Sequence, residues 1–162
     1  MRDQPDIAYD PTAKPETSPN RPFQLYRFIT PPAALATRNL AFAGMTTTIS
    51  TSIVAQAQAL WICAFFDAKL DRLPSRETAQ WEAVLHSRFG KWRYPCGYGA
   101  RLPDFVFDAV PYVDMLLRDV GVKTHRKKSK IAEIWEPYGA ADYKGLVNEW
   151  KRTHVVTPSQ TN

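Results

Sequence analysis

The sequence predicts a mainly helical protein with a short strand region. Three observations favour this class: apolar residues recur at helical spacing after residue 50, one short apolar run ends in a glycine, and seven of the 13 prolines fall at or before Pro32. A hydrophobic content of 44% argues against a wholly disordered chain, and 162 residues suffice for one domain with a sizeable core.

Three regions are expected along the chain. Residues 1–22 mix proline with polar residues without periodicity, which predicts a disordered arm. Residues 23–152 form the folded segment, and residues 153–162 form a flexible tail. Within the folded segment, residues 23–29 are interpreted as extended, and the pair Pro31-Pro32 ends any regular structure there.

Residues 39–43 are expected to form a short buried strand. Gly44 ends it, and a glycine at this place either permits a positive φ or lets another backbone or a ligand approach closely. Six of the seven residues from Thr46 to Ser52 are Ser or Thr. Such hydroxyls accept from the first amides of a helix, so a helix is predicted to begin near residues 50–52.

That helix is expected to run to about residue 69 and is apolar nearly all round, although it carries Gln56, Gln58 and Trp61. A helix of this kind is typical of the middle of a large protein, where it packs on two sides. In a short chain one face would lack cover. The apolar 52–68 helix therefore predicts association with a second copy or with a partner.

Four more helices are predicted. Residues 76–89 have Trp81, Val84 and Leu85 inward and stop at Gly90, and residues 109–119 have Asp108 as cap and Gly121 as stop. Residues 130–135 and 141–152 complete the set. Between Lys91 and Pro103, glycine, proline and aromatic residues indicate an ordered loop.

Composition argues against several classes. The net charge of +5 and pI near 9.3 come mostly from one basic run, interpreted as a solvated loop; without interleaved aromatic residues it does not indicate nucleic-acid binding. No apolar stretch reaches the roughly 20 residues of a membrane span, and no signal peptide opens the sequence. Two cysteines without metal or redox spacing fit a reduced, cytoplasmic setting.

The sequence predicts no catalytic residue and no metal site. His86 is placed on the polar side of its helix, and His125 and His154 have no recognisable carboxylate or nucleophile partner. Asp104, Asp108 and Asp114 are interpreted as helix caps or dipole partners.

The turn at Gly44 is the exception. A strand end, a glycine and a helix N-terminus together offer backbone amides and a positive dipole to an electron-rich ligand group, while an ordinary capped turn has the same pattern. Both interpretations stay open from the residues alone.

The chain resembles the C-terminal part of fungal flavin-containing monooxygenases. The resemblance covers about residues 23–152 and is carried by ordered landmarks: Asn-Leu-Ala-Phe-Ala-Gly-Met at 39–45, Ala-Gln-Ala-Gln-Ala-Leu-Trp at 55–61, Leu-Pro-Ser at 73–75, Trp-Arg-Tyr-Pro at 92–95, Pro-Asp-Phe-Val-Phe-Asp at 103–108, Pro111-Tyr112, Pro137-Tyr138, and Asp142-Tyr143 with Gly145.

This resemblance implies a partial α/β fold, the C-terminal remnant of a flavoprotein with two dinucleotide-binding domains. It implies FAD and NADPH as cofactors, oxygenation of a soft nucleophile or insertion of oxygen beside a carbonyl, and a place in secondary metabolism. By the same resemblance, four residues would lie against the flavin ring: Gly44, Met45, Thr51 and Ser52. Gln56, one helical turn further, would line the same cavity.

The sequence departs from that family in one respect, because it contains no Gly-x-Gly-x-x-Gly loop for either dinucleotide. We therefore expect the chain alone to bind little FAD or NADPH. Two classes of function stay open. One is a monooxygenase segment completed by a flavoprotein partner through the 52–68 helix, and the other is a non-catalytic interaction protein or inactive remnant.

Overall fold

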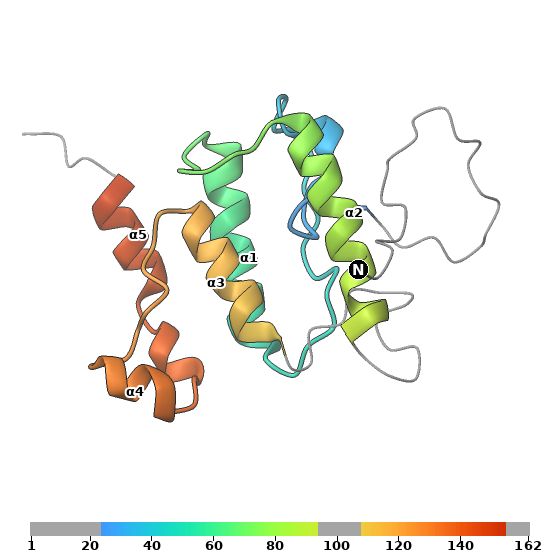
Figure 1. The fold of residues 1–162 in the computed structure, drawn as a ribbon. Coiled ribbons are helices and arrows are strands. Elements are labelled where there is room, and N and C mark those ends of the chain that lie inside the picture. The colour runs from blue at the N-terminus through green and yellow to red at the C-terminus, as the bar shows by residue number, and fades with distance from the viewer. Residues whose placement is uncertain (1–23, 94–107, 155–162) are drawn as a thin grey trace, which may run out of the picture. The chain divides into compact units, whose positions relative to one another are not determined.

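The computed structural model describes residues 24–93 and 108–154, with the side chains of residues 89–92 left aside. Its regular elements are all helical: η1 (Pro32–Ala34), α1 (Thr51–Phe66), α2 (Arg76–Arg93), α3 (Ala109–Asp119), α4 (Lys130–Trp135), η2 (Ala140–Tyr143) and α5 (Leu146–His154), as Figure 1 shows. The mainly helical class is confirmed. The predicted arm, most of the predicted loop after α2 and the tail beyond His154 lie outside the described residues.

The described residues group into two compact units. The first joins residues 24–48 to residues 74–93, and the second joins residues 49–73 to residues 108–154. Each unit is therefore built from segments far apart in the sequence, and each has its own packing.

The first unit packs α2 against η1 and a tight turn. The amide of Tyr26 donates to the carbonyl of Thr30 at 2.8 Å, and Arg27 and Phe28, which lie between them, each have a φ of 55°. Arg27 reaches Glu82 on α2 at 2.8 Å. The expectation of an extended 23–29 segment is wrong over its described part, because the chain reverses there and the ion pair holds the turn against the helix.

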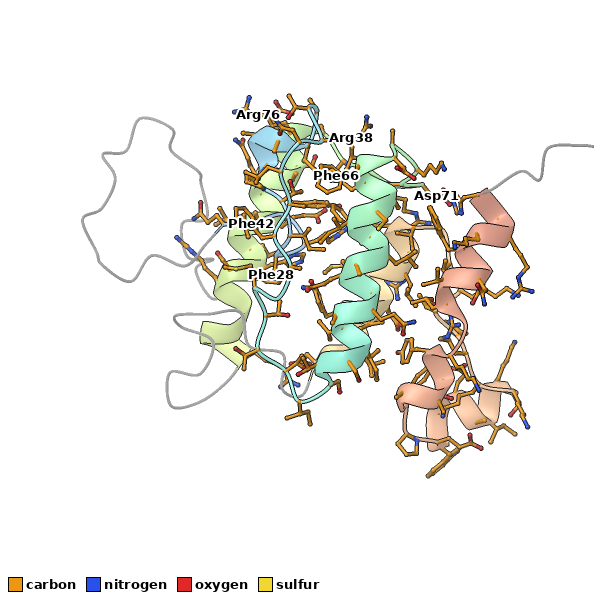
Figure 2. The ribbon with its side chains drawn as sticks, turned by 180° about the vertical axis from the view of Figure 1, so that it is seen from behind. Phe28, Arg38, Phe42, Phe66, Asp71 and Arg76 are labelled. Atoms are coloured by element: carbon orange, nitrogen blue, oxygen red, sulfur yellow. The ribbon has the colours of Figure 1, made fainter. Side chains whose placement is uncertain are left out.

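The expected strand at 39–43 does not form: residues 24–93 and 108–154 contain no β-strand. The amide of Phe42 donates to the carbonyl oxygen of Ile29 at 2.7 Å, and the hydroxyl of Thr30 donates to the carbonyl oxygen of Leu40 at 2.7 Å. These bonds lead to the 26–30 turn and not to an extended neighbour, so no ladder can propagate. Leu40 and Phe42 are also 43% and 39% exposed, so the segment is not buried. Phe42 is labelled in Figure 2.

Helix α2 differs from its prediction in length and in its inner face. It continues through Gly90 to Arg93, since a glycine inside a helix is tolerated at a modest cost. Trp81 is 51% exposed, and Leu85 is also exposed. Val84 is buried as predicted, and the small residues Ala79, Ala83 and Ser87 take the other inner positions.

The second unit is organised around α1 and α3, which lie side by side (Figure 1). Helix α1 confirms its prediction to within a few residues. Two polar side chains of this largely apolar helix are satisfied across the contact: Gln58 Nε2 donates to the Tyr112 hydroxyl at 2.8 Å, and Trp61 Nε1 donates to Asp119 Oδ2 at 3.0 Å.

Turns close α3 and shape the C-terminal part. Gly121 has a φ of +68° just after α3, as expected for a helix stop, whereas the Asp108 side chain makes no cap bond with the first turn. Helix α4 forms with the predicted bounds. The single helix expected over 141–152 is instead η2 and α5, because Lys144 is extended and Gly145 takes a φ of +83° between them.

Candidate functional site

The turn before α1 contains the first two predicted flavin-ring residues. Gly44 has a φ of +75°, and a Cβ added to it would meet no atom within 4 Å, so the backbone conformation and not a close neighbour favours glycine here. Met45 is half-buried. The hydroxyl oxygen of Thr46 is buried and has no hydrogen-bond partner among the described residues. This turn belongs to the first unit.

The other three predicted residues lie at the start of α1, in the second unit. Thr51, Ser52 and Gln56 are all exposed, and Ser52 and Gln56 share one face because they are four residues apart. The Ser50 side chain makes no cap bond with the first turn. The structure thus brings these three together at the positive end of a helix dipole, where hydroxyl, amide and carboxamide groups can stabilise negative charge.

Gln58 and Trp61 have another role. Both point into the α1–α3 contact, where their polar groups have buried partners. They support α1 and are not available to a ligand in the second unit.

His86 is half-buried, which corrects its expected place on the polar side of α2. Its ring lies 6.1 Å from that of Phe28, and burial, with Arg27 nearby, lowers the pKa of His86 to about 4. The imidazole is thus neutral at pH 7. Its Nδ1 atom is buried without a hydrogen-bond partner among the described residues.

Two other titratable side chains also differ from expectation. His154 has a carboxylate partner, since its Nε2 lies 3.0 Å from Asp71 Oδ1, and its ring stacks on Trp150. Asp114 lies inside α3 and not at its start, and burial raises the pKa of its carboxyl group. Within the described part of the chain, no three His, Cys, Asp or Glu side chains gather as metal ligands.

The basic run contains structural cations that sequence reasoning missed. Arg126 donates to Glu149 at 2.8 Å and to the carbonyl oxygens of Asp142 and Lys123, while Lys127 donates to Asp142 Oδ2 at 2.9 Å. Their side chains are only 8% and 9% exposed. The solvated-loop interpretation is wrong for these two residues. Four acids within the next 25 residues, at positions 133, 136, 142 and 149, were the available signal.

A groove of about 530 Å³ runs along α5 within the second unit. Lys123, Lys144 and Arg152 line it, together with Glu149, whose carboxylate is already paired with Arg126. The groove is therefore basic on balance and has the charge to hold a small anion.

Comparison with known proteins gives relatives but no structural template. No protein-family model and no solved structure matches the chain. The FAD-dependent monooxygenase rstn6 of Aspergillus nomiae is 36% identical over an alignment that covers 95% of this chain and 28% of that protein. The FAD-dependent monooxygenase resA of Aspergillus sclerotiorum is 35% identical over 90% of this chain and 25% of that protein.

A third relative is also an FAD-dependent monooxygenase. The FAD-dependent monooxygenase DEP4 of Alternaria brassicicola is 31% identical over 90% of this chain and 25% of that protein. The chain is a homologue of part of the fungal FAD-dependent monooxygenases. It spans about a quarter of the length of these relatives. None of the helices in the described ranges is both long and apolar enough to cross a bilayer.

Proposed function

We propose that this chain supplies one wall of the flavin site of an FAD-dependent monooxygenase. Similarity to rstn6 over 95% of the chain carries the proposal. The left-handed backbone of Gly44 and the exposed first turn of α1 are compatible with it. FAD, when bound, supplies the activation of dioxygen and the transfer of one oxygen atom to a substrate.

The residues of the wall have distinct roles in this proposal. Gly44 keeps the turn free of a side chain, and Met45 offers an apolar contact to the ring. The first turn of α1, with Thr51 and Ser52, stabilises negative charge on the reduced ring through its amides and dipole. Gln56 orients the ring edge by hydrogen bonding.

The remaining parts of the cofactor sites come from other sequence. The 162 residues contain no glycine-rich dinucleotide loop, so the FAD pyrophosphate and NADPH need residues outside them. In this proposal the wall belongs to a flavoprotein with two dinucleotide-binding domains. We infer that the chain by itself binds little FAD and acts only when those domains complete the site, on a secondary metabolite.

A graft into a relative tests this function. The matching stretch of Aspergillus nomiae rstn6 is replaced by this chain, and the FAD that copurifies per protein is measured by flavin absorbance. We expect the chimera to retain FAD, and the isolated chain to give no stoichiometric flavin complex. A folded chimera without FAD, beside a flavin-loaded parent, would contradict the proposal.

Point variants in the chimera then test the wall. Ser52→Ala and Gln56→Ala are expected to weaken FAD retention by about fivefold each and to shift the flavin absorption maximum, because each removes a polar contact of roughly 1 kcal/mol. Asn148→Ala, an exposed polar change on α5, is the control. Flavin properties that are identical in all three variants would remove Ser52 and Gln56 from the site.

A further inference from the structure

Helix α4 exposes its apolar face to solvent and turns its polar face towards the rest of the unit. Ile131, Ile134 and Trp135 are 72%, 79% and 81% exposed, and no residue of this helix is buried. Because they are spaced i, i+3 and i+4, the three side chains share one face. That face is a contiguous apolar surface directed to solvent, which we call the α4 tip.

The opposite side of α4 is held by polar contacts. Glu133 accepts from the amide of Lys127 at 2.6 Å and from the hydroxyl of Tyr138, and Ser129 caps the helix by accepting from the amide of Ala132 at 3.1 Å. These contacts lower the pKa of Glu133 and keep the carboxylate charged. Specific hydrogen bonds therefore fix the orientation of α4. The apolar face points to solvent because the opposite face is held by these bonds.

The cations around the tip divide into two sets. Arg126 and Lys127 turn inward to Glu149 and Asp142. Lys128 and Lys130 are exposed immediately before and at the start of α4, and no carboxylate among the described residues pairs with them. Glu136, the exposed acid that follows Trp135 directly, lies 4.0 Å from Lys127 Nζ, which already pairs with Asp142. Positive charge thus lies on one side of the apolar tip, at Lys128 and Lys130, while Glu133 and Glu136 lie on its other sides.

Size and charge together indicate the kind of partner. Three side chains alone do not reach the roughly 800 Å² per partner of a stable protein interface, which disfavours a second copy. An isoleucine and tryptophan tip beside lysines has the composition of elements that insert shallowly into a bilayer surface, where lysine stems extend while their ammonium groups stay near phosphates.

We propose that the α4 tip docks this protein on an anionic phospholipid surface, with Ile131, Ile134 and Trp135 inserted and Lys128 and Lys130 against the lipid phosphates. The docking is peripheral and reversible, because the helix is far too short to span a bilayer. It is independent of the flavin wall, which is formed by other residues.

Cosedimentation with vesicles tests the proposal on the whole chain. We expect binding to vesicles of phosphatidylglycerol and phosphatidylcholine, at least fivefold weaker binding to pure phosphatidylcholine, and a loss of that difference in 0.5 M salt. The double variant Ile134→Ser/Trp135→Ser should lose at least tenfold in binding. Lys128→Gln/Lys130→Gln should lose the preference for the anionic lipid.

A matched control separates the tip from general hydrophobicity. The double variant Ile49→Ser/Trp81→Ser removes the same residue types from exposed positions elsewhere, and it should bind within twofold of the parent. Circular dichroism verifies that each variant is folded. Equal loss in both double variants, or the absence of vesicle binding, would overturn the proposal.

Two further outcomes would also overturn it. One is a concentration-dependent dimer, seen by sedimentation, that Ile134→Ser/Trp135→Ser abolishes, since this would assign the tip to a second copy. The other concerns the fluorescence of Trp135 in the rstn6 chimera, which is identified by comparison with the Trp135→Phe variant. If acrylamide does not quench this fluorescence, the tip is buried inside the longer protein.

Discussion

At the scale of single residues, two glycines with left-handed backbone angles have different surroundings. A Cβ added to Gly121 would lie 1.9 Å from Asp71 Oδ2, whereas one added to Gly145 would meet nothing within 4 Å. The side chain of Asp71 is labelled in Figure 2. Its Oδ1 lies 3.0 Å from His154 Nε2, so moving the side chain breaks this contact. Glycine is therefore favoured at position 121 for two reasons, the left-handed backbone and the closeness of the Asp71 side chain.

This difference gives a matched pair of substitutions. Gly145→Ala should lower the free energy of unfolding by about 1 kcal/mol, the cost of a left-handed alanine. Gly121→Ala should lower it by about 1 to 2 kcal/mol, because the exposed side chain of Asp71 must also leave His154, and a surface pair of this kind contributes at most about 1 kcal/mol. Urea denaturation measures both values. Equal losses would show that the contact with Asp71 carries no stability.

The neutral imidazole of His86 predicts a pH dependence. Its pKa is about 4 in the folded chain and about 6.5 when unfolded, so the unfolded chain binds more protons between these values. The free energy of unfolding should therefore fall as the pH drops from 6.5 towards 4, by no more than about 3 kcal/mol.

The measurement is urea denaturation at pH 7, 5.5 and 4.5. His86→Gln should remove most of the slope between pH 7 and 4.5, since it keeps a neutral side chain throughout. His125→Gln, an exposed change, controls for the loss of a histidine. If His86→Gln leaves the pH dependence of the free energy of unfolding unchanged, the imidazole of His86 is not buried in its neutral form.

At the scale of elements, the α1–α3 contact depends on two polar bonds within an apolar seam. Asp119→Ala should cost about 2 kcal/mol, because it leaves the Trp61 indole N–H buried without its acceptor. Tyr112→Phe should cost about 1 kcal/mol through the lost partner of Gln58. Asp119→Asn keeps an acceptor oxygen and should cost less than Asp119→Ala in the same denaturation experiment.

At the scale of the whole molecule, the flavin wall and the α4 tip should be separable. In the rstn6 chimera, Gln56→Ala should weaken FAD retention and leave vesicle binding within twofold, while Ile134→Ser/Trp135→Ser should do the reverse. Flavin absorbance and cosedimentation on the same preparations measure both. Loss of both functions in either variant, with an intact circular dichroism spectrum, would indicate coupling between the two surfaces.

The local sequence predicted most helices because their hydrogen bonds join residues a few positions apart. Hydroxyl residues and apolar spacing placed α1, and Gly121 placed the end of α3. The strand at 39–43 was wrong because a strand needs a distant partner, and the described neighbour of Phe42 is a turn. The five flavin-wall residues are still a prediction, drawn from family resemblance and not from local pattern.

By itself, the sequence determined where most helices form and which proteins the chain is related to, since both depend on the local order of residues. Only the tertiary structure decided which polar groups are buried and which apolar groups are not. Arg126 and Lys127 turn inward because acids from η2 and α5 meet them there. Ile134 and Trp135 turn outward because Glu133 holds the other face of α4, and neither direction can be predicted before distant segments pack.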